Sequence, residues 1–400
     1  MQKAATSLLI RIGLVIAALL FAPVHAQRVA PKPPAGLALL EGRGAVLGTT
    51  RYGSADLPPQ GSPLRARLEQ AVGAGLGGFT LYLDWPALEP EPGEYAFGPS
   101  LAQLEALQGL GLQTFVNITV GDIGAYVLPA PFSDGEGGIA AGRRLDDPAL
   151  LQRFGALLDA LIPELVTRGT FALGVGNEID DRLEDSVDER AAYRSFVAAA
   201  NARVDALVPE LPVGVTLTAA AHRNDTETRE SLVPVADFVA LNYAPIDPNF
   251  FVLPRDMIAA DFRETLAAMP PGPVLIQELT CPNPASLGAS LDWQADCFDI
   301  LLNEIARRPT VRFASVFSLE DFDGTTCSAV QDILGAGLDD VPPDFLQRFL
   351  DYLCGLGVLA ADGTPNPAWR VLLEFVQREP GAVRRALLSG RRNFNARGGY

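Results

Sequence analysis

The segment from Asp147 to Glu178, DPALLQRFGALLDALIPELVTRGTFALGVGNE, joins a long helical pattern to a short strand-like run. Asp147 is a typical helix N-cap, apolar residues then recur at helical spacing, and Gly169 follows the last turn. The next run, 171–177, consists of apolar residues and glycine and ends abruptly at Asn177-Glu178. A helix that leads directly into a continuous apolar strand is typical of a parallel sheet covered by helices.

The same alternation repeats eight times along the 400-residue chain. Eight units favour a closed (β/α)8 TIM barrel over a doubly wound sheet, and no GxGxxG motif or P-loop follows the first strand. We therefore predict an α/β protein with a single barrel domain over residues 44–380. The expected strands are 45–50, 78–85, 113–119, 171–177, 212–218, 237–243, 273–278 and 312–318. The expected helices are 62–75, 100–111, 147–169, 188–208, 226–232, 256–268, 289–307 and 365–378.

The beginning of the chain has the pattern of a cleavable signal peptide. Residues 1–26 contain two positive charges, an apolar core and Val24-His25-Ala26 as an A-x-A-like cleavage site. A permanent membrane span is the alternative interpretation, but the apolar run is short and no stop-transfer pattern follows it. We therefore expect a secreted or periplasmic protein without a membrane association after signal removal.

Three other segments lack the barrel alternation. Residues 27–43 are expected to form a flexible lead into the barrel, and residues 381–400 a C-terminal tail. The segment 318–363, between the last strand and the last helix, is long, and we predict an excursion over the barrel mouth. Nothing in these segments indicates a second domain.

Composition restricts the chemistry and the partners. Removal of residues 1–26 takes the formal charge from −17 to −19, which argues against a nucleic-acid partner. The only lysines, Lys3 and Lys32, precede the barrel, so Schiff-base chemistry is excluded. His222 is the only histidine after His25, so a multi-histidine metal site is impossible. Acid–base chemistry must depend mainly on carboxylates, and we expect no metal and no cofactor.

The four cysteines, Cys281, Cys297, Cys327 and Cys354, all lie in the last third of the chain. In an oxidising compartment an even set of this kind indicates disulfides rather than a metal site. Three pairings are possible, and proximity in sequence favours Cys281–Cys297 and Cys327–Cys354.

Two glutamates follow predicted strands and carry the functional hypothesis. Glu178 follows the fourth strand and Glu278 the seventh, and a barrel gathers residues after its strands on the C-terminal face. Two carboxyl groups about 5 to 5.5 Å apart suit a retaining glycosidase, with one as nucleophile and the other as acid/base. The charge of Glu278 would keep Glu178 protonated.

These residues and two flanking passages make the chain resemble glycoside hydrolase clan A, the 4/7 superfamily of retaining β-glycosidases on (β/α)8 barrels. The motif Asn177-Glu178 matches the acid/base motif of the clan, and Glu278 in VLIQELT matches its nucleophile position. The first passage, LDWPALEPEPGEYAF (83–97), resembles the strand-2 segment of the clan. The second, GLGVLAADGTPNPAW (355–369), resembles the motif that precedes the last helix in the clan.

The resemblance also implies roles for other residues. Asn177 would hydrogen-bond the 2-hydroxyl group of the sugar, and Tyr243 would orient Glu278 and keep it ionised. Many clan members have a tryptophan after the eighth strand, whereas this chain offers only Phe317 there.

Three further substrate-binding candidates lie at strand ends, and each has a structural alternative. Trp85 is a subsite wall or plain packing, Asn117 faces the pocket or satisfies loop backbone, and His222 binds a sugar hydroxyl or anchors a loop.

The expected function is that of an exported retaining β-glycoside hydrolase, a monomer that acts on a β-linked carbohydrate. Glu178 would protonate the glycosidic oxygen while Glu278 attacks the anomeric carbon. One alternative is a catalytically inactive barrel that binds carbohydrate. Another is a metal-dependent barrel hydrolase, which the single histidine disfavours.

Overall fold

The computed structural model describes residues 45–50, 57–184, 186–335 and 342–378. The predicted signal peptide, the lead 27–43 and the tail 381–400 lie outside the described residues. All described residues belong to Pro34–Tyr400, the larger of the two units into which the chain divides.

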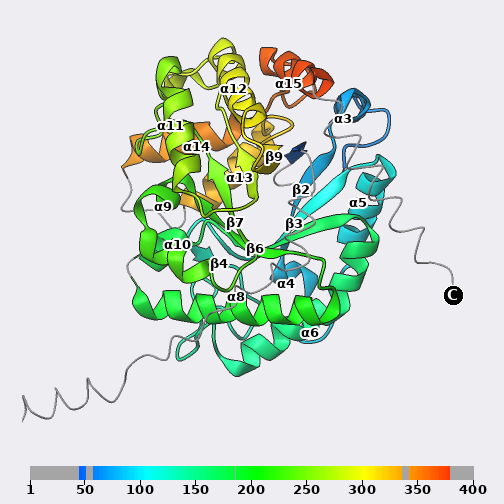
Figure 1. Cartoon of the computed structure of the whole chain (residues 1–400), viewed down its shortest axis with the longest axis vertical. Coiled ribbons are helices and arrows are strands. Elements are labelled where there is room, and N and C mark those ends of the chain that lie inside the picture. Colours follow the sequence, from blue (N-terminus) through cyan, green and yellow to red (C-terminus); the bar gives the residue numbers. More distant parts are fainter. Residues whose placement is uncertain (1–44, 51–56, 185, 336–341, 379–400) are drawn as a thin grey trace, which may run out of the picture. The chain divides into compact units, whose positions relative to one another are not determined.

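Eight parallel strands form a closed barrel, which confirms the predicted fold class (Figure 1). Pairing between β2 and β3 closes the ring. A short antiparallel strand, β4 (Ala125–Tyr126), folds back onto the end of β3, so the last five barrel strands are numbered β5 to β9. The barrel strands are β1 (Val46–Thr50), β2 (Gly78–Asp84), β3 (Gln113–Asp122), β5 (Thr170–Asn177), β6 (Val213–Thr218), β7 (Phe238–Tyr243), β8 (Val274–Leu279) and β9 (Val311–Val316).

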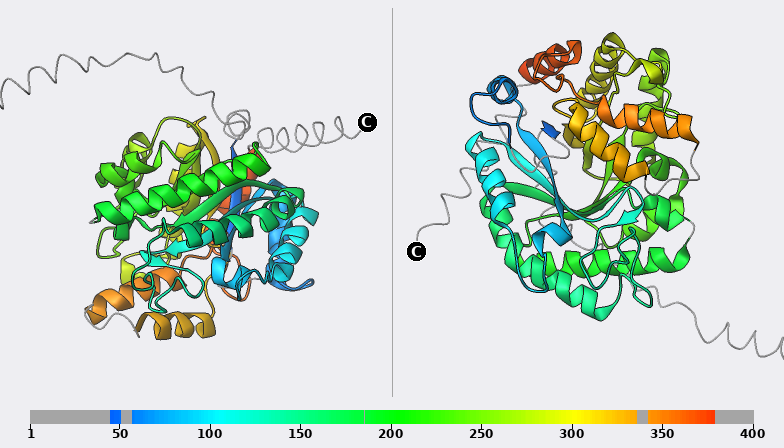
Figure 2. Two further views of the ribbon diagram at one scale, coloured as in Figure 1. Left: turned by 90° about the horizontal axis from the view of Figure 1, so that it is seen from below. Right: turned by 180° about the vertical axis from the view of Figure 1, so that it is seen from behind.

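Helices surround the barrel, as the three views show (Figures 1 and 2). The eight predicted helices are α3 (Pro63–Ala74), α5 (Gly98–Gly109), α6 (Pro148–Thr167), α8 (Val187–Leu207), α10 (Thr226–Leu232), α11 (Arg255–Ala268), α12 (Leu291–Ala306) and α15 (Pro367–Arg378). Short helices that the sequence did not predict lie in the loops after strands: α4 (Trp85–Leu88), α7 (Asp180–Glu184), α9 (Ala219–Asn224) and the 3-10 helix η1 (Ala285–Leu287).

Local chemistry explains where several helices begin. The side chain of Ser62 accepts a hydrogen bond from the first turn of α3, and that of Asp147 accepts one from the first turn of α6. Ser290 does the same for α12. Each cap satisfies a backbone N–H group that has no partner inside its helix, at a typical value of about 1 kcal/mol.

The barrel interior is apolar at one end and polar at the other. Residues near the strand starts form a buried cluster that includes Phe115, Phe238 and Phe313, whose rings pack edge to face. Two larger apolar clusters lie on other residues of the strands and the surrounding helices. The interior near the strand ends holds amide and hydroxyl side chains instead, and this is the face where barrel enzymes place their active sites.

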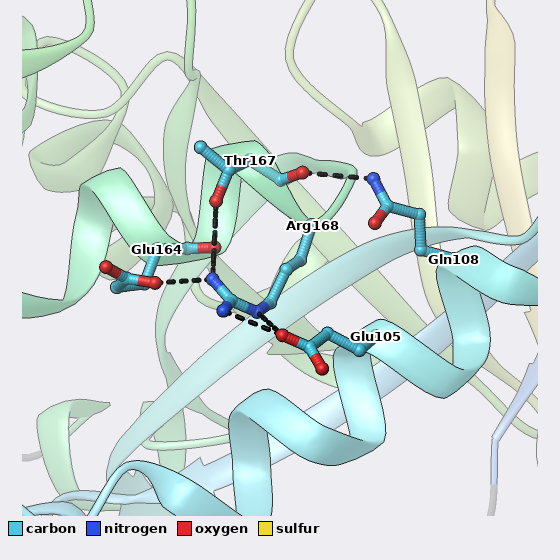
Figure 3. A network of polar contacts seen from close by, with 5 residues as sticks. All are labelled: Glu105, Gln108, Glu164, Thr167 and Arg168. Carbon is cyan, nitrogen blue, oxygen red and sulfur yellow. Dashed lines mark hydrogen bonds and ion pairs between the residues drawn. The ribbon is translucent and has the colours of Figure 1, made fainter.

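At the end of the barrel where the strands begin, an ion-pair network connects two helices on the surface (Figure 3). Arg168, at the end of α6, contacts Glu164 on its own helix and Glu105 on α5, at 2.5 and 2.8 Å. Gln108 of α5 also donates to the carbonyl of Thr167, at 3.0 Å. Because these residues precede β5 and are partly exposed, the network contributes modestly to helix packing and has no part in the site.

The segment between β9 and α15 is the predicted excursion. It contains α13 (Gly324–Gly335) and α14 (Pro343–Cys354), which lie together at one end of the barrel (Figure 2). The disulfide Cys327–Cys354 joins these two helices, and Cys281–Cys297 joins the loop after β8 to α12. Both predicted pairings are therefore confirmed.

Candidate active site

Strand β8 carries one residue more than its neighbours at its end. Leu241 of β7 pairs with Ile276 and Asn242 pairs with Glu278, so Gln277 has no counterpart on β7. The pairing with β9 shows the same irregularity. A bulge breaks the two-residue alternation of a strand and redirects its side chains. Gln277 and Glu278, although adjacent in sequence, therefore both contact the polar interior of the barrel.

Strand β5 is also irregular where it ends. Its pairing with β6 skips a residue between 174 and 177. Gly176 has a φ of 108°, and a Cβ atom there would lie 2.5 Å from the hydroxyl of Tyr193, so glycine is required. Glu178 follows with a φ of 46°, which is uncommon for a residue with a side chain and typical of strained functional positions.

Glu278 lies on β8 itself, at the end of the expected strand 273–278. Its Oε1 atom accepts a hydrogen bond from the hydroxyl of Tyr82 on β2. Burial raises the pKa of Glu278, the hydrogen bond from Tyr82 opposes that rise, and the charge of Asp122 adds to it.

Glu178 accepts a hydrogen bond at Oε1 from Nδ2 of Asn242, at 2.8 Å. Burial raises the pKa of Glu178 well above its ordinary value, and the charges of Glu278 and Asp180 raise it further. The two carboxyl groups therefore interact directly, and ionisation of one opposes ionisation of the other. The pKa of Glu278 is raised to about 8, and its charge, once formed, raises the pKa of Glu178, so Glu278 is the first of the two to lose its proton.

Beneath the glutamates lies a set of polar side chains that we call the amide floor: Asn117 on β3, Asn177 on β5, Thr216 on β6, Asn242 on β7 and Gln277 on β8. Every member is buried, at 5 % exposure or less. They hydrogen-bond to one another across the barrel at 2.7 to 3.0 Å. A buried polar network of this kind holds its members in one arrangement, because any change leaves groups without partners.

A third carboxylate approaches the glutamates from the β3–β4 hairpin. Asp122 accepts a hydrogen bond from Nδ2 of Asn177 at 2.8 Å. Its charge raises the pKa of both Glu178 and Glu278, so it lies close to the pair. A separate cavity of about 110 Å³ is lined mainly by residues of α7 and α9, including Asp180 and Asp181, and neither glutamate lines it. The charge of Asp122 would repel an anionic ligand at the glutamate pair.

Helix α14 reaches the same site from the excursion. The hydroxyl of Tyr352 lies 3.1 Å from Oγ1 of Thr280, just after β8. Burial raises the pKa of Tyr352, and the charges of Glu178 and Glu278 raise it further, which places this tyrosine beside the glutamates.

The Tyr352 ring belongs to a cluster that we call the aromatic wall: Phe250, Phe345, Phe349 and Tyr352. Phe250, from the loop after β7, packs against the three rings of α14 with centroid separations of 5.1 to 5.3 Å. The wall therefore attaches α14 to the barrel by apolar contacts.

Two of the predicted substrate-binding residues point away from the site. Tyr243 donates a hydrogen bond to Asp261 of α11 at 2.8 Å, and Tyr82 makes the contact with Glu278 that was expected of Tyr243. The physical reason is strand alternation: Asn242 faces the interior, so its neighbour Tyr243 faces the helices. Trp85 is fully buried in the outer core, and its indole N–H donates to Glu89 at 2.9 Å.

His222 is also removed from the site. It is fully buried in α9, and its Nε2 atom lies 3.0 Å from the carbonyl oxygen of Ala240 on β7. This arrangement fits the structural alternative, an anchoring histidine, and Trp85 likewise fits packing.

Two of the remaining candidates, Asn177 and Asn117, lie in the amide floor, but their amide groups bond to protein atoms. Phe317 directly follows β9 and is 4 % exposed.

Sequence reasoning missed Tyr82, Asn242, Gln277 and Tyr352. A signal for Tyr82 was available, because the run FTLYLD (79–84) alternates apolar residues with Thr80, Tyr82 and Asp84. No comparable signal marked Gln277, whose direction depends on the bulge.

Neither a metal site nor a membrane span occurs in the part of the chain that the structure describes. No three His, Cys, Asp or Glu side chains there converge as metal ligands. No helix there has the length and apolarity needed to cross a membrane.

No family model and no curated protein sequence matches the chain. Solved structures do match. An exo-β-1,4-mannosidase from Opitutaceae bacterium strain TAV5 is 18% identical with a TM-score of 0.59, over 86% of this chain and 60% of that chain. This chain thus matches less than two thirds of that enzyme's length.

Two further similar structures match over most of their own length. A GH5_18 protein from Streptomyces cattleya, in complex with GlcNAc, is 18% identical with a TM-score of 0.61, over 84% of this chain and 80% of that chain. A GH5_18 variant from Bifidobacterium longum subsp. longum ATCC 55813, in complex with Manβ1-4GlcNAc, is 14% identical with a TM-score of 0.64, over 84% and 79%. At these identities the comparison establishes a shared fold, the (β/α)8 barrel.

Proposed function

We propose that the protein is a retaining β-glycoside hydrolase of clan A, with Glu178 as acid/base and Glu278 as nucleophile. The observation that carries the proposal is the glutamate pair itself. Two buried carboxyl groups, from the ends of β5 and β8, act on each other's charge and receive separate hydrogen bonds, from Asn242 and Tyr82. Burial raises both pKa values, but Glu278 ionises before Glu178, and this order matches the nucleophile and acid/base roles of a retaining glycosidase.

The reaction proceeds in two steps. In the first, the Glu278 carboxylate attacks the anomeric carbon while Glu178 gives its proton to the departing glycosidic oxygen. In the second, Glu178 takes a proton from water, the water oxygen attacks the anomeric carbon, and the bond to Glu278 breaks. The sugar leaves with its original β configuration, and both glutamates return to their starting protonation states.

A neutral β-linked sugar is the substrate that fits this site. Asp122 and Asp180 surround the pair with negative charge and would repel a uronic acid. The similar structures include a mannosidase and a GH5_18 variant in complex with Manβ1-4GlcNAc, so β-mannosides are the first substrates to test. Export is part of the proposal, because disulfides such as the two found here persist in oxidising compartments.

Export is tested on protein recovered from the medium or periplasm, whose N-terminal residue should be Gln27 if residues 1–26 are removed. The glycosidase activity is tested by measuring glycoside release by the same protein. Glu278→Ala should lower turnover of aryl β-glycosides by roughly 10⁴-fold or more, since the covalent step is lost. Azide should restore turnover of Glu178→Ala as the β-glycosyl azide and of Glu278→Ala as the α-glycosyl azide.

The exposed Glu374→Ala on α15 is the control and should retain full activity. Turnover that survives in both active-site variants would refute the site. Carbohydrate binding by the wild type without any turnover would instead identify an inactive binding barrel.

A further inference from the structure

Gln277 is the most highly bonded member of the amide floor. Its Oε1 accepts hydrogen bonds from Asn117 Nδ2 at 2.8 Å and from Thr216 Oγ1 at 2.7 Å. Its Nε2 donates to Asn177 Oδ1 at 2.7 Å and to the hydroxyl of Tyr82 at 3.2 Å. All four hydrogen-bonding positions of this amide are therefore used, and the side chain is fully buried.

The direction of the Gln277 amide follows from a backbone carbonyl. Nδ2 of Asn117 also lies 3.0 Å from the carbonyl oxygen of Gly176, which can only accept a hydrogen bond. The Asn117 atom at this position must therefore be the amide nitrogen. The Gln277 atom that faces it must be the amide oxygen, which leaves the Gln277 nitrogen to face Tyr82.

This direction decides where the Tyr82 proton goes. The Tyr82 oxygen accepts an N–H from Gln277, so its single O–H is available for Oε1 of Glu278. A hydroxyl that donates to a carboxylate stabilises the charged form. Protonation of Glu278 would weaken this hydrogen bond, because a neutral carboxyl group is a poorer acceptor than a carboxylate.

We propose that Gln277 is a positioning residue that assigns the two glutamates their roles, by holding the Tyr82 hydroxyl so that its proton points to Glu278. This hydrogen bond favours the carboxylate form of Glu278, so that Glu278 ionises before Glu178. The placement of the proton rests on the hydrogen bonds alone, whereas its catalytic consequence rests on the proposed function.

The other groups around Glu278 oppose this effect or supply less of it. Asp122 from the β3–β4 hairpin and Glu178 after β5 carry or acquire negative charge, which disfavours a charge on Glu278. Tyr352 of α14 bonds to Thr280. Asn242 of β7 donates to Asn177 and Glu178, and a hydrogen bond from it also lowers the pKa of Glu278, but by less than the one from Tyr82. Tyr82 is thus the group whose donated proton favours the charged form of Glu278 most strongly.

The first test measures the proton directly and needs no substrate. Full-length protein labelled with ¹³C at the glutamate carboxyl carbons is titrated by NMR, and the Glu278 signal is identified by its loss in Glu278→Gln. In Gln277→Met, which keeps the side-chain length without hydrogen bonds, the apparent pKa of Glu278 should rise by about one to two units. Tyr82→Phe should give a similar rise, and the double variant should give no further rise.

The same variants test the catalytic consequence. The acidic limb of the kcat/KM profile should move to higher pH in both, by the same amount as the NMR titration. Gln294→Met is the matched control, because Gln294 is fully buried and donates at 3.0 Å to the carbonyls of Cys281 and Gly357, outside this network. It should lower stability without moving the Glu278 titration.

The outcomes separate the two proposals. An unshifted Glu278 titration in both Gln277→Met and Tyr82→Phe would overturn the positioning role, even if activity fell. A shifted titration in a protein without glycosidase turnover would uphold the proton placement and reject the proposed function. Equal losses of activity at every pH would show a purely structural role.

Discussion

The amide floor and the aromatic wall border the same pair of glutamates but are built by opposite means. The floor consists of buried side chains on barrel strands, joined by directional hydrogen bonds that leave Gln277 no alternative orientation. The wall consists of rings on α14 and the loop after β7, joined by contacts without fixed direction, and the disulfide Cys327–Cys354 attaches α14 to α13.

The difference indicates a division of labour. Under the proposed function, chemistry at the anomeric carbon tolerates little error in position or protonation, so it suits a site supported by hydrogen bonds within the rigid sheet. Recognition of the sugar can vary between related enzymes, so it suits a packed segment in a long loop. Three changes test this comparison.

The largest effect is expected from the floor. Asn117→Ala removes the donor to Gln277 and to the Gly176 carbonyl and leaves a small cavity. We expect the free energy of unfolding to fall by about 2 to 4 kcal/mol and kcat by roughly 100-fold. Denaturant titration and steady-state kinetics measure both. Asn303→Ala, in a surface turn of α12, should change stability by less than about 0.5 kcal/mol. Equal effects of the two substitutions would remove the distinction between floor and surface.

A smaller effect on stability is expected from the ionisation of His222, a buried residue of α9 outside the amide floor. Burial lowers the pKa of His222 to about 4, and the positive charge of Arg229 lowers it too. Among the described residues the Nδ1 atom has no hydrogen-bond partner, so a second proton would be buried without an acceptor there.

The sign of the pH dependence follows. The unfolded chain, with an ordinary histidine pKa of about 6.5, binds more protons than the folded chain between pH 4 and 6.5. The contribution of His222 is complete above pH 6.5 and is lost as the pH falls towards 4, by up to about 3 kcal/mol. Denaturation midpoints should depend less on pH in His222→Gln over this range. Parallel curves would show that His222 does not titrate as described.

The smallest effect on stability is expected from the disulfide Cys327–Cys354, which holds the wall helix α14 to α13. In Cys327→Ser/Cys354→Ser, we expect KM to rise by up to about tenfold while the main melting temperature of the barrel changes by only about 2 °C. The reason is that the disulfide Cys327–Cys354 constrains the excursion 318–363 and not the barrel core. In the matched variant Cys281→Ser/Cys297→Ser, both sites lie in the fully buried core, and stability should fall by about 3 kcal/mol. A wall variant that unfolds the whole barrel would contradict the division.

Several predictions from sequence are confirmed because they depend on patterns along the chain. The eight strands, the eight helices between them and both disulfide pairings follow from apolar runs, caps and cysteine spacing. The glutamates after the fourth strand and on the seventh lie in one site. The signal peptide, the oligomeric state and the sugar remain predictions.

The choice between neighbouring residues could not be made from sequence alone. Tyr243 was expected at Glu278, but the inward direction belongs to Asn242 on the same strand, and Tyr82 from β2 makes the contact. A shift of one residue along a strand exchanges its two faces. Tyr352 was missed for a different reason, since 72 residues separate it from its partner Thr280.

The sequence by itself therefore determined the barrel, its order of elements and the two carboxyl groups, because each depends on local periodicity and residue type. Only the tertiary structure decided which hydrogen bonds the two carboxyl groups receive. That depends on the bulge that turns Gln277 inward and on hydrogen bonds between strands β2, β3, β5, β6 and β8. The direction of a side chain on a strand depends on its pairing with neighbouring strands, and pairing exists only once the barrel closes.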